Sequence, residues 1–357
     1  MSYIMKKPKC NNIFSWAVGL TASLILYLAP TGATATETLQ AIKNIQSEVS
    51  RALANEQFAQ INAMADNLSE SRERLPDGRW KLSFVIYGLT GDIPKRDASA
   101  WHARLQLMDR WIAATPGNPT PYVAKAQFLL AYAWDARGNG YANTVKEEDW
   151  PIFRQRIAQA RDTLEKSANI SKRSPLWYEK MQDIATAQSW PEEDFVRLFR
   201  EGAAKEPANY FLYFNAADYL LPRWHGSARQ LADFVNSAVA ATEKKEGQTL
   251  YTRIYWSLLW ALEDKTFSPG YADWPRMRQG FEDIVRVYPD NWNLNAYTYY
   301  ACMAQDWQTA RIIGAKLTTV AMELWKDPQV YKRCMQEPSS GRQKSAAHIQ
   351  QPASHPR

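Results

Sequence analysis

Proline and glycine divide most of this chain into segments of helix length, and one class of these segments begins at a loose period near 40 residues. One set of segments opens on a tryptophan–proline pair, at Trp150-Pro151, Trp190-Pro191 and Trp274-Pro275. Proline suits the first position of a helix because the N–H that it lacks would have no partner there. Each pair therefore predicts the start of a helix.

A second set of segments alternates with the first. We name the tryptophan–proline segments, and the similar segments that follow Asp97, Ser227 and Trp307, the B helices. The second set, the A helices, opens on a proline followed by an aromatic residue, at Pro119 and Tyr122, Pro175 and Tyr178, Pro207 and Tyr210, and Pro289 and Trp292. Alternation of two helix classes at this period is typical of an α-solenoid. The sequence therefore predicts an all-α fold, an α-α superhelix of about six TPR-like helical hairpins.

The segments outside the repeat also favour helices. Lys81–Leu89 is the only strand-like stretch, and because no alternating run with hairpin turns continues from it, we interpret it as a buried helix. Residues 37–73 are polar and amphipathic, which predicts one long helix or a helix pair. We thus expect N-terminal helices over 36–79, a helical-repeat domain over 80–335 and a disordered tail over 336–357.

The first 35 residues have the order of a secretory signal peptide. Met1–Cys10 holds three lysines and no acid, Ile13–Ala29 is mostly apolar, and a proline and a glycine end that run. Ala33-Thr34-Ala35 then supplies the small residues of a cleavage site. We expect cleavage near Ala35 and a periplasmic or secreted protein. The alternative is an uncleaved membrane anchor, although the apolar run is at the short end for spanning a bilayer.

Cleavage near Ala35 would leave Cys302 and Cys334 as the only cysteines. In an oxidising compartment the two can form one disulfide, which would link the final helices, and the alternative is two buried thiols. No other apolar stretch has the length of a membrane span, so we expect none to remain after the signal is removed.

The formal net charge of +6 is carried by the two ends of the chain. The basic residues concerned are Lys6, Lys7, Lys9, Arg342, Lys344 and Arg357. Without them, basic and acidic residues are equal in number. A folded part that is neutral gives no argument for a nucleic-acid partner, and we expect none.

Several ordered motifs resemble those of a known bacterial family. They are Ala136–Val145 (ARGNGYANTV), Leu221–Ser227 (LPRWHGS), Glu246-Gly247, Tyr251–Trp256 (YTRIYW), Asp273–Met277 (DWPRM), Tyr288–Asn293 (YPDNWN) and Ala301-Cys302. On these motifs the chain, from residue 80 to 335, is similar to the family catalogued as domain of unknown function 4034 (DUF4034). The resemblance implies a bacterial origin and carries no established activity, substrate or cofactor. In the family's pattern the position of His225 is usually glycine, which argues against a shared chemical role for His225.

No spacing in the sequence marks a catalytic or metal site. Ser227 beside His225 could suggest a nucleophile and its base, but such pairs usually come from distant segments, and Ser227 with Gln230 is typical of a capping box. Outside the tail the histidines are His102 and His225, far apart, and neither HExxH nor CxxC occurs. We therefore expect no catalytic residue, no metal and no cofactor.

Two glycines close to an arginine, at Gly138 and Gly140, could suggest a phosphate-binding loop. A phosphate-binding loop leads from a strand into a helix, whereas these glycines follow a helix. We expect both to allow left-handed turns at the helix end, and Thr144 with Glu147 to form a capping box for the next helix.

The connections that lead from A helices to B helices are longer than the others, at 136–149, 221–227 and 264–274. In a solenoid these connections lie along one edge of the molecule. We expect them to form a continuous binding edge, with candidate residues Arg137, Asn139, Tyr141, Arg223, Trp224, His225, Asp273 and Trp274. Arginine and aromatic side chains on rigid loops suit a protein or peptide partner, or another ligand with a carboxylate.

Two functions from different classes remain open at this point. The first is a non-enzymatic scaffold that binds a protein or peptide partner through the concave face or the loop edge. The alternative is a hydrolase that acts on envelope material through a carboxylate site that the sequence does not mark. A deep cleft with two buried acids would favour the hydrolase, and a shallow groove of arginine and tryptophan would favour the scaffold.

Overall fold

A computed structural model describes residues 36–90, 93, 97–138, 140, 142–224 and 226–336. Among these residues all named elements of secondary structure are helices, which confirms the predicted all-α class. No helix in this described part combines the length and the apolar character needed to cross a membrane. The predicted signal peptide, the tail from residue 337 onward, and Asn139, Tyr141 and His225 lie outside the described residues.

The A and B helices alternate along the chain as the punctuation predicted. The A helices are α5 (Thr120–Arg137), α8 (Leu176–Ala187), α10 (Tyr210–Tyr219), α12 (Thr249–Ser257) and α15 (Asn291–Met303). The B helices are α4 (Ala98–Ala114), α6 (Asp149–Lys166), α9 (Glu192–Lys205), α11 (Ala228–Glu246), α14 (Trp274–Val287) and α16 (Trp307–Gly314). Short elements join or follow them: η1 (Ala142–Thr144), α7 (Ala168–Ser171), α13 (Leu259–Leu262), η2 (Glu263–Lys265), α17 (Met322–Trp325) and α18 (Pro328–Gln336).

Local capping explains why many of these helices begin where they do. The side chains of Asp97, Ser227 and Asp306 each accept a hydrogen bond from a backbone N–H in the first turn of α4, α11 and α16. At Ser227 the hydroxyl oxygen accepts from the N–H of Gln230 at 3.2 Å, so this predicted capping interaction is confirmed. These contacts satisfy N–H groups that the start of a helix leaves without partners.

Residues ahead of the repeats form three helices, α1 (Glu37–Ala54), α2 (Phe58–Ser71) and α3 (Lys81–Tyr87). The stretch 37–73 is thus a helix pair, and the strand-like segment that begins at Lys81 is a buried helix, as predicted. We name residues 36–90 the N-terminal cover.

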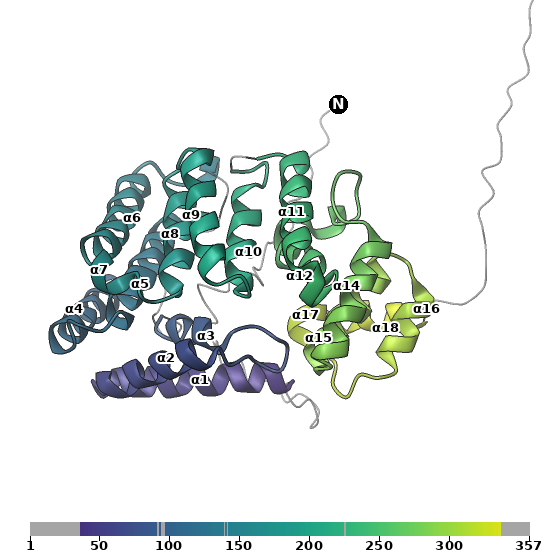
Figure 1. The fold of residues 1–357 in the computed structure, drawn as a ribbon, viewed down its shortest axis with the longest axis horizontal. Coiled ribbons are helices and arrows are strands. Elements are labelled where there is room, and N and C mark those ends of the chain that lie inside the picture. Colours follow the sequence, from purple (N-terminus) through teal and green to yellow (C-terminus); the bar gives the residue numbers. More distant parts are fainter. Residues whose placement is uncertain are drawn as a thin grey trace, which may run out of the picture.

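Figure 1 shows the helices from α4 to α16 following one another in a row, with α1 and α2 lying along one edge of it. Within the row, α8 contacts both α5 and α10, and α10 contacts α12. The N-terminal cover touches these same A helices, through contacts of α3 with α5 and of α1 with α15. We call the side of the A helices that contacts the cover the inner face.

The N-terminal cover is held on the inner face by polar contacts as well as by packing. Arg253 of α12 is buried, and its Nη2 donates to the carbonyl of Asp77 at 2.6 Å. At the beginning of α15, Thr38 donates its hydroxyl proton to Asp290 at 3.0 Å. Arg74 donates to the carbonyl of Ala208, just before α10, at 3.0 Å. The chain itself therefore occupies part of the inner face.

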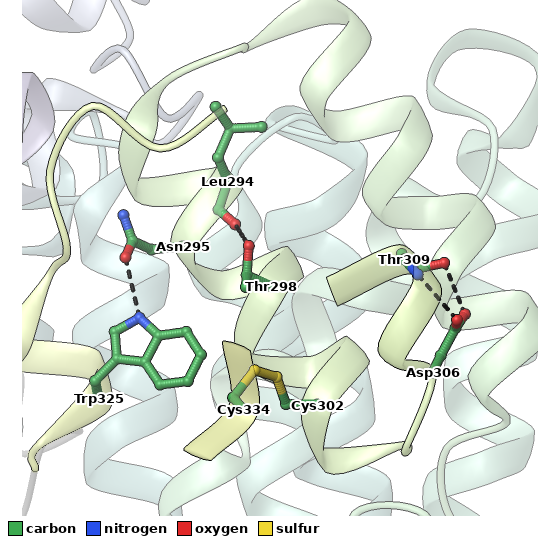
Figure 2. The surroundings of a disulfide bond; sticks show 8 residues. All are labelled: Leu294, Asn295, Thr298, Cys302, Asp306, Thr309, Trp325 and Cys334. Atoms are coloured by element: carbon green, nitrogen blue, oxygen red, sulfur yellow. Dashed lines mark hydrogen bonds between the residues drawn. A yellow bond between two sulfur atoms is a disulfide. The ribbon is translucent and has the colours of Figure 1, made fainter. Parts of the chain in front are cut away.

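The C-terminal end of the row has a covalent link in addition to its contacts with the cover. Cys302 of α15 and Cys334 of α18 form a disulfide, with their Cα atoms 5.7 Å apart (Figure 2). Beside it, Asn295 accepts from the indole N–H of Trp325 at 3.0 Å, which attaches α17 to α15 (Figure 2). The geometry agrees with the predicted staple of the final helices.

Candidate functional site

The first two of the three predicted loops meet at one edge of the molecule. Arg137 is the last residue of α5, and Arg223 and Trp224 lie in the connection from α10 to α11. The rings of Trp134 and Trp224 pack edge to face with centroids 6.3 Å apart. Arg137 and Arg223 are close enough for each charge to affect the other. The two arginines therefore do not lie on opposite faces, an arrangement that would have excluded a shared edge.

Arg137 is a partly buried cation held between aromatic rings. Its guanidinium lies 5.0 Å from the ring centroid of Trp134 and 5.1 Å from that of Trp150, and it donates to the carbonyls of Gly138 and Gly140. Burial lowers the pKa of Arg137, and the neighbouring charge of Arg223 lowers it further. In the described part of the chain no carboxylate forms an ion pair with Arg137.

Arg223 joins this group from the next loop. Its guanidinium stacks on Trp260 at 3.6 Å from the ring centroid and lies 5.0 Å from that of Trp224. It also forms an ion pair with Asp218 at 3.1 Å, and about a third of its side chain stays exposed (35%). We name this group the Arg/Trp cluster; its members are Trp134, Arg137, Trp150, Arg223, Trp224 and Trp260.

The glycines that shape the first loop differ in their roles. Gly138 ends α5 with a φ of +73°, as predicted, because glycine adopts this conformation without a steric penalty. The predicted left-handed turn at Gly140 involves Asn139, which lies outside the described residues; a side chain at Gly140 would collide with the Thr144 hydroxyl. The predicted capping box at Thr144 is wrong, because Thr144 ends η1 and α6 begins only at Asp149.

The third loop lies beside the second, but its two candidate residues have structural contacts. Gly270 approaches Ala228 at the beginning of α11. Asp273 caps α14 by accepting from the N–H of Arg276. Trp274 donates its indole N–H to Asp306 at 3.0 Å and so links α14 to α16. These contacts account for Asp273 and Trp274 without a ligand.

A second polar group, which the sequence analysis missed, lies on the inner face beside the Arg/Trp cluster. Its centre is Lys180 of α8, whose side chain is 1% exposed. The Lys180 ammonium contacts Asp183 at 2.7 Å, the side-chain oxygen of Gln127 at 2.9 Å and the hydroxyl of Tyr87 at 3.3 Å. Burial alone would lower the pKa of Lys180, but Asp183, Tyr87 and Glu179 together raise it above its ordinary value.

Glu179, the neighbour of Lys180, is buried against the N-terminal cover. Its Oε1 accepts from Asn209 at 2.7 Å and from Ser83 of α3 at 3.2 Å, while its Oε2 has no hydrogen-bond partner among the described residues. Burial raises the pKa of Glu179 to about 7, although Lys180 acts in the opposite direction. The Glu179 carboxyl thus takes up a proton at a higher pH than a solvent-exposed glutamate does.

Two further carboxylates lie between Lys180 and the loop edge. Asp183 accepts from Asn215 at 3.0 Å, and Asp218 pairs with Arg223. Burial raises the pKa of Asp218, with Arg223 acting against this and the charge of Asp183 adding to it. Both carboxylates nevertheless keep about a third of their side chains exposed, 32% and 31%. Asp183 and Asp218 are thus partly buried but still accessible to solvent.

Helical spacing places these residues in one line. On α10, Phe211, Asn215 and Asp218 follow at i, i+4 and i+7, so they share a face that runs from α3 to the loop edge. We name Tyr87, Glu179, Lys180, Asp183, Asn215 and Asp218 the inner polar cluster. The ion pair of Asp218 with Arg223 connects it directly to the Arg/Trp cluster.

The sequence feature that could have revealed the inner polar cluster is the presence of charged residues on an A helix. Glu179, Lys180 and Asp183 follow an apolar and aromatic start of α8, on a helix whose role appeared to be packing. Three charged residues at this spacing on an A helix would have indicated a polar site at this point of the inner face. The partners of these charges, Tyr87 and Asn215, are distant in sequence and gave no signal.

No group of three or more potential metal ligands occurs in the part of the chain that the structure describes. Comparison with known proteins adds no relative: no family model matches the chain, and neither the curated proteins nor the solved structures give a significant match. The resemblance to the family of domain 4034 therefore stays a prediction, and a function has to be argued from the two clusters.

Proposed function

We propose that the protein is an exported, periplasmic helical-repeat scaffold that binds a protein or peptide partner, and that it holds a carboxylate of that partner at the Arg/Trp cluster. The partner would occupy the loop edge rather than the part of the inner face under the N-terminal cover. The chemistry proposed is recognition without catalysis.

The observation that carries this proposal is Arg137. A guanidinium that is partly removed from water and stacked between Trp134 and Trp150 has lost hydration without gaining an acidic partner among the described residues. Repulsion from Arg223 further disfavours the charged form of Arg137. A planar carboxylate from a ligand compensates for the lost hydration because it accepts two parallel hydrogen bonds from the planar guanidinium group.

Export and the superhelical architecture belong to the same proposal. In support of export, the N-cap of α1 is Thr36, whose side chain accepts from the N–H of Leu39, so cleavage after Ala35 would leave this capped helix whole. In support of a superhelix of hairpins, A and B helices alternate, and α5, α8, α10 and α12 stack in that order. Mass determination of the protein recovered from the periplasm tests the cleavage position.

Peptides with and without a terminal carboxylate test the binding proposal. One pool of mixed acetylated pentapeptides would carry a free C-terminal carboxylate, and a second pool of the same sequences would be amidated. We expect tryptophan fluorescence to change with the first pool only, and the change to be lost in Arg137→Ala/Arg223→Ala. Arg200→Ala, at an exposed position on α9, is the matched control. Equal responses to both pools, or no effect of the double substitution, would refute a carboxylate site.

A hydrolase acting on envelope material is the second candidate, and one observation favours it. Asp183 and Asp218 are both open to solvent, and burial together with the charge of Asp183 raises the pKa of Asp218. A carboxyl with a raised pKa beside a second carboxylate is the arrangement that can divide the roles of acid and base. Release of soluble fragments from purified cell-wall material, abolished in Asp183→Asn, is the result that would support this candidate over the scaffold.

A further inference from the structure

The two clusters form a continuous site whose ends carry opposite charge. At the loop edge lie the guanidinium groups of Arg137 and Arg223. On the inner face lie the carboxylates of Asp183 and Asp218, with Lys180 as the one ammonium of the inner polar cluster. Charges of opposite sign at the two ends of one site select a ligand with the reverse arrangement.

The inner end has carboxylate acceptors to spare. Asp183 accepts from Lys180 and Asn215, and Asp218 pairs with Arg223, whereas a carboxylate has about four positions for donors. The two carboxylates also repel each other, because the charge of Asp183 raises the pKa of Asp218. An additional donor cation would satisfy acceptors and reduce the repulsion.

The aromatic residues between the ends suit an aliphatic linker. Trp224 and Trp260 flank Arg223, which makes the contact between the two clusters. Indole faces pack against methylene groups and also attract a cation. An aliphatic chain with a charge at each end can therefore pack against the partly exposed side chains of Trp224 and Trp260.

We infer that the group recognised here is an amino carboxylate, with its ammonium at Asp183 and Asp218 and its carboxylate at Arg137. This inference rests on the proposed function and makes it more specific. In a peptide partner the group would be a terminal carboxylate with a primary amine within reach, as in a C-terminal lysine.

A series of small probes tests this directly. Hexanoate carries the carboxylate alone, hexylamine the amine alone, and 6-aminohexanoate both; the shorter and longer ω-amino acids, from glycine to 8-aminooctanoate, vary the separation. Each would be titrated at constant ionic strength and followed by tryptophan fluorescence and ligand-observed NMR. We expect at least one amino acid of the series to bind about tenfold more tightly than the simple carboxylate of equal length, since the second end adds charge-assisted hydrogen bonds.

Substitutions separate the two ends. Asp183→Asn/Asp218→Asn preserves side-chain size, and we expect it to reduce the affinity for the preferred amino acid to that for the simple carboxylate. Arg137→Ala is expected to weaken both ligands. Asp162→Asn, on the exposed surface of α6, is the control and should change neither. Urea unfolding of each variant would show that it is folded.

The outcomes distinguish this inference from the proposed function. If hexanoate binds in an Arg137-dependent way and the added amine gives no gain at any length, the amino-carboxylate inference is wrong and the carboxylate site stands. If no simple carboxylate binds and the peptide pools also fail, both are wrong. Tighter binding that persists in Asp183→Asn/Asp218→Asn would also refute the inference, because the amine would then lie elsewhere.

Discussion

Two regions of this protein differ in how their charged groups are paired. The first is the part of the inner face under the N-terminal cover, which we call the covered end; the second is the loop edge, which we call the open end. Under the N-terminal cover, buried polar groups find partners supplied by residues 36–90: Glu179 contacts Ser83, Lys180 contacts Tyr87, and Arg253 contacts the carbonyl of Asp77. At the loop edge, which the cover does not reach with any described contact, Arg137 has aromatic neighbours and no described acidic partner.

The comparison indicates which charges have a structural role and which are available for a ligand. Where the partners of a buried ion belong to the fold, removing one partner leaves the other charge uncompensated and lowers stability. A cation that lacks such a partner contributes little to stability and can be paired by a ligand without breaking an existing contact. The predictions below test this division, beginning with the largest expected effect.

At the covered end, Lys180→Met should lower the free energy of unfolding by about 3–5 kcal/mol, because Asp183 would lose its buried partner. Urea unfolding at neutral pH measures the loss. Lys166→Met is the matched control, since Lys166 is 78% exposed and its removal should change stability by at most about 0.5 kcal/mol. Equal losses in the two variants would break the distinction between covered and exposed charges.

The stability of the C-terminal end of the row should depend on its disulfide. Cys302 and Cys334 are separated by 32 positions, and opening a loop of this length should cost about 3–4 kcal/mol on a chain-entropy model. Urea unfolding with and without a reducing agent measures the difference, and Cys302→Ser/Cys334→Ser should be insensitive to the reducing agent. Free thiols in protein made under oxidising conditions would contradict this expectation.

Glu179 gives the covered end a pH dependence. Its pKa is raised to about 7 in the folded protein from an ordinary value of 4.5, so folding favours the protonated form. The stability contributed by this group is present in full below pH 4.5 and is lost as the pH rises through 7, a change of up to about 3 kcal/mol. Denaturant unfolding from pH 4.5 to 8 should show this decline in the wild type and a smaller one in Glu179→Gln. Parallel curves for the two proteins would assign the decline to another group.

The smallest change in stability is expected at the open end. Arg137→Ala removes cation–π contacts and two hydrogen bonds to carbonyls but no described ion pair, so the loss should stay below about 1 kcal/mol. The same variant should lose the response to carboxylate-bearing peptides. A loss of stability comparable to that of Lys180→Met would show that Arg137 supports the fold, and the open end would then resemble the covered one.

Much of the helical framework could be predicted because its signals are local. Asp97 and Ser227 are followed by helices that their own side chains cap, and Gly138 ends a helix with the positive φ that glycine allows. The capping box predicted at Thr144 failed because the chain there forms the short helix η1, and α6 begins only at Asp149.

The candidate site could be predicted only in part. Arg137, Arg223 and Trp224 were identified because they lie on long loops at the same point of the repeat. The carboxylates of Asp183 and Asp218 were missed, since on the sequence they belong to helices that pack the core. Asp273 and Trp274 were identified by the same loop argument, yet their contacts are those of a helix cap and a link between α14 and α16.

The sequence by itself determined which segments are helices, how they alternate and where many of them begin, because capping, proline placement and helical periodicity act over a few residues. The tertiary structure alone decided that residues 36–90 lie against the inner face, that Lys180 meets Tyr87 and that Arg137 lies near Arg223. These contacts join residues far apart in the chain, and burial then determines which charges are paired. A charge is visible in a sequence, but whether it has a partner depends on what the fold brings beside it.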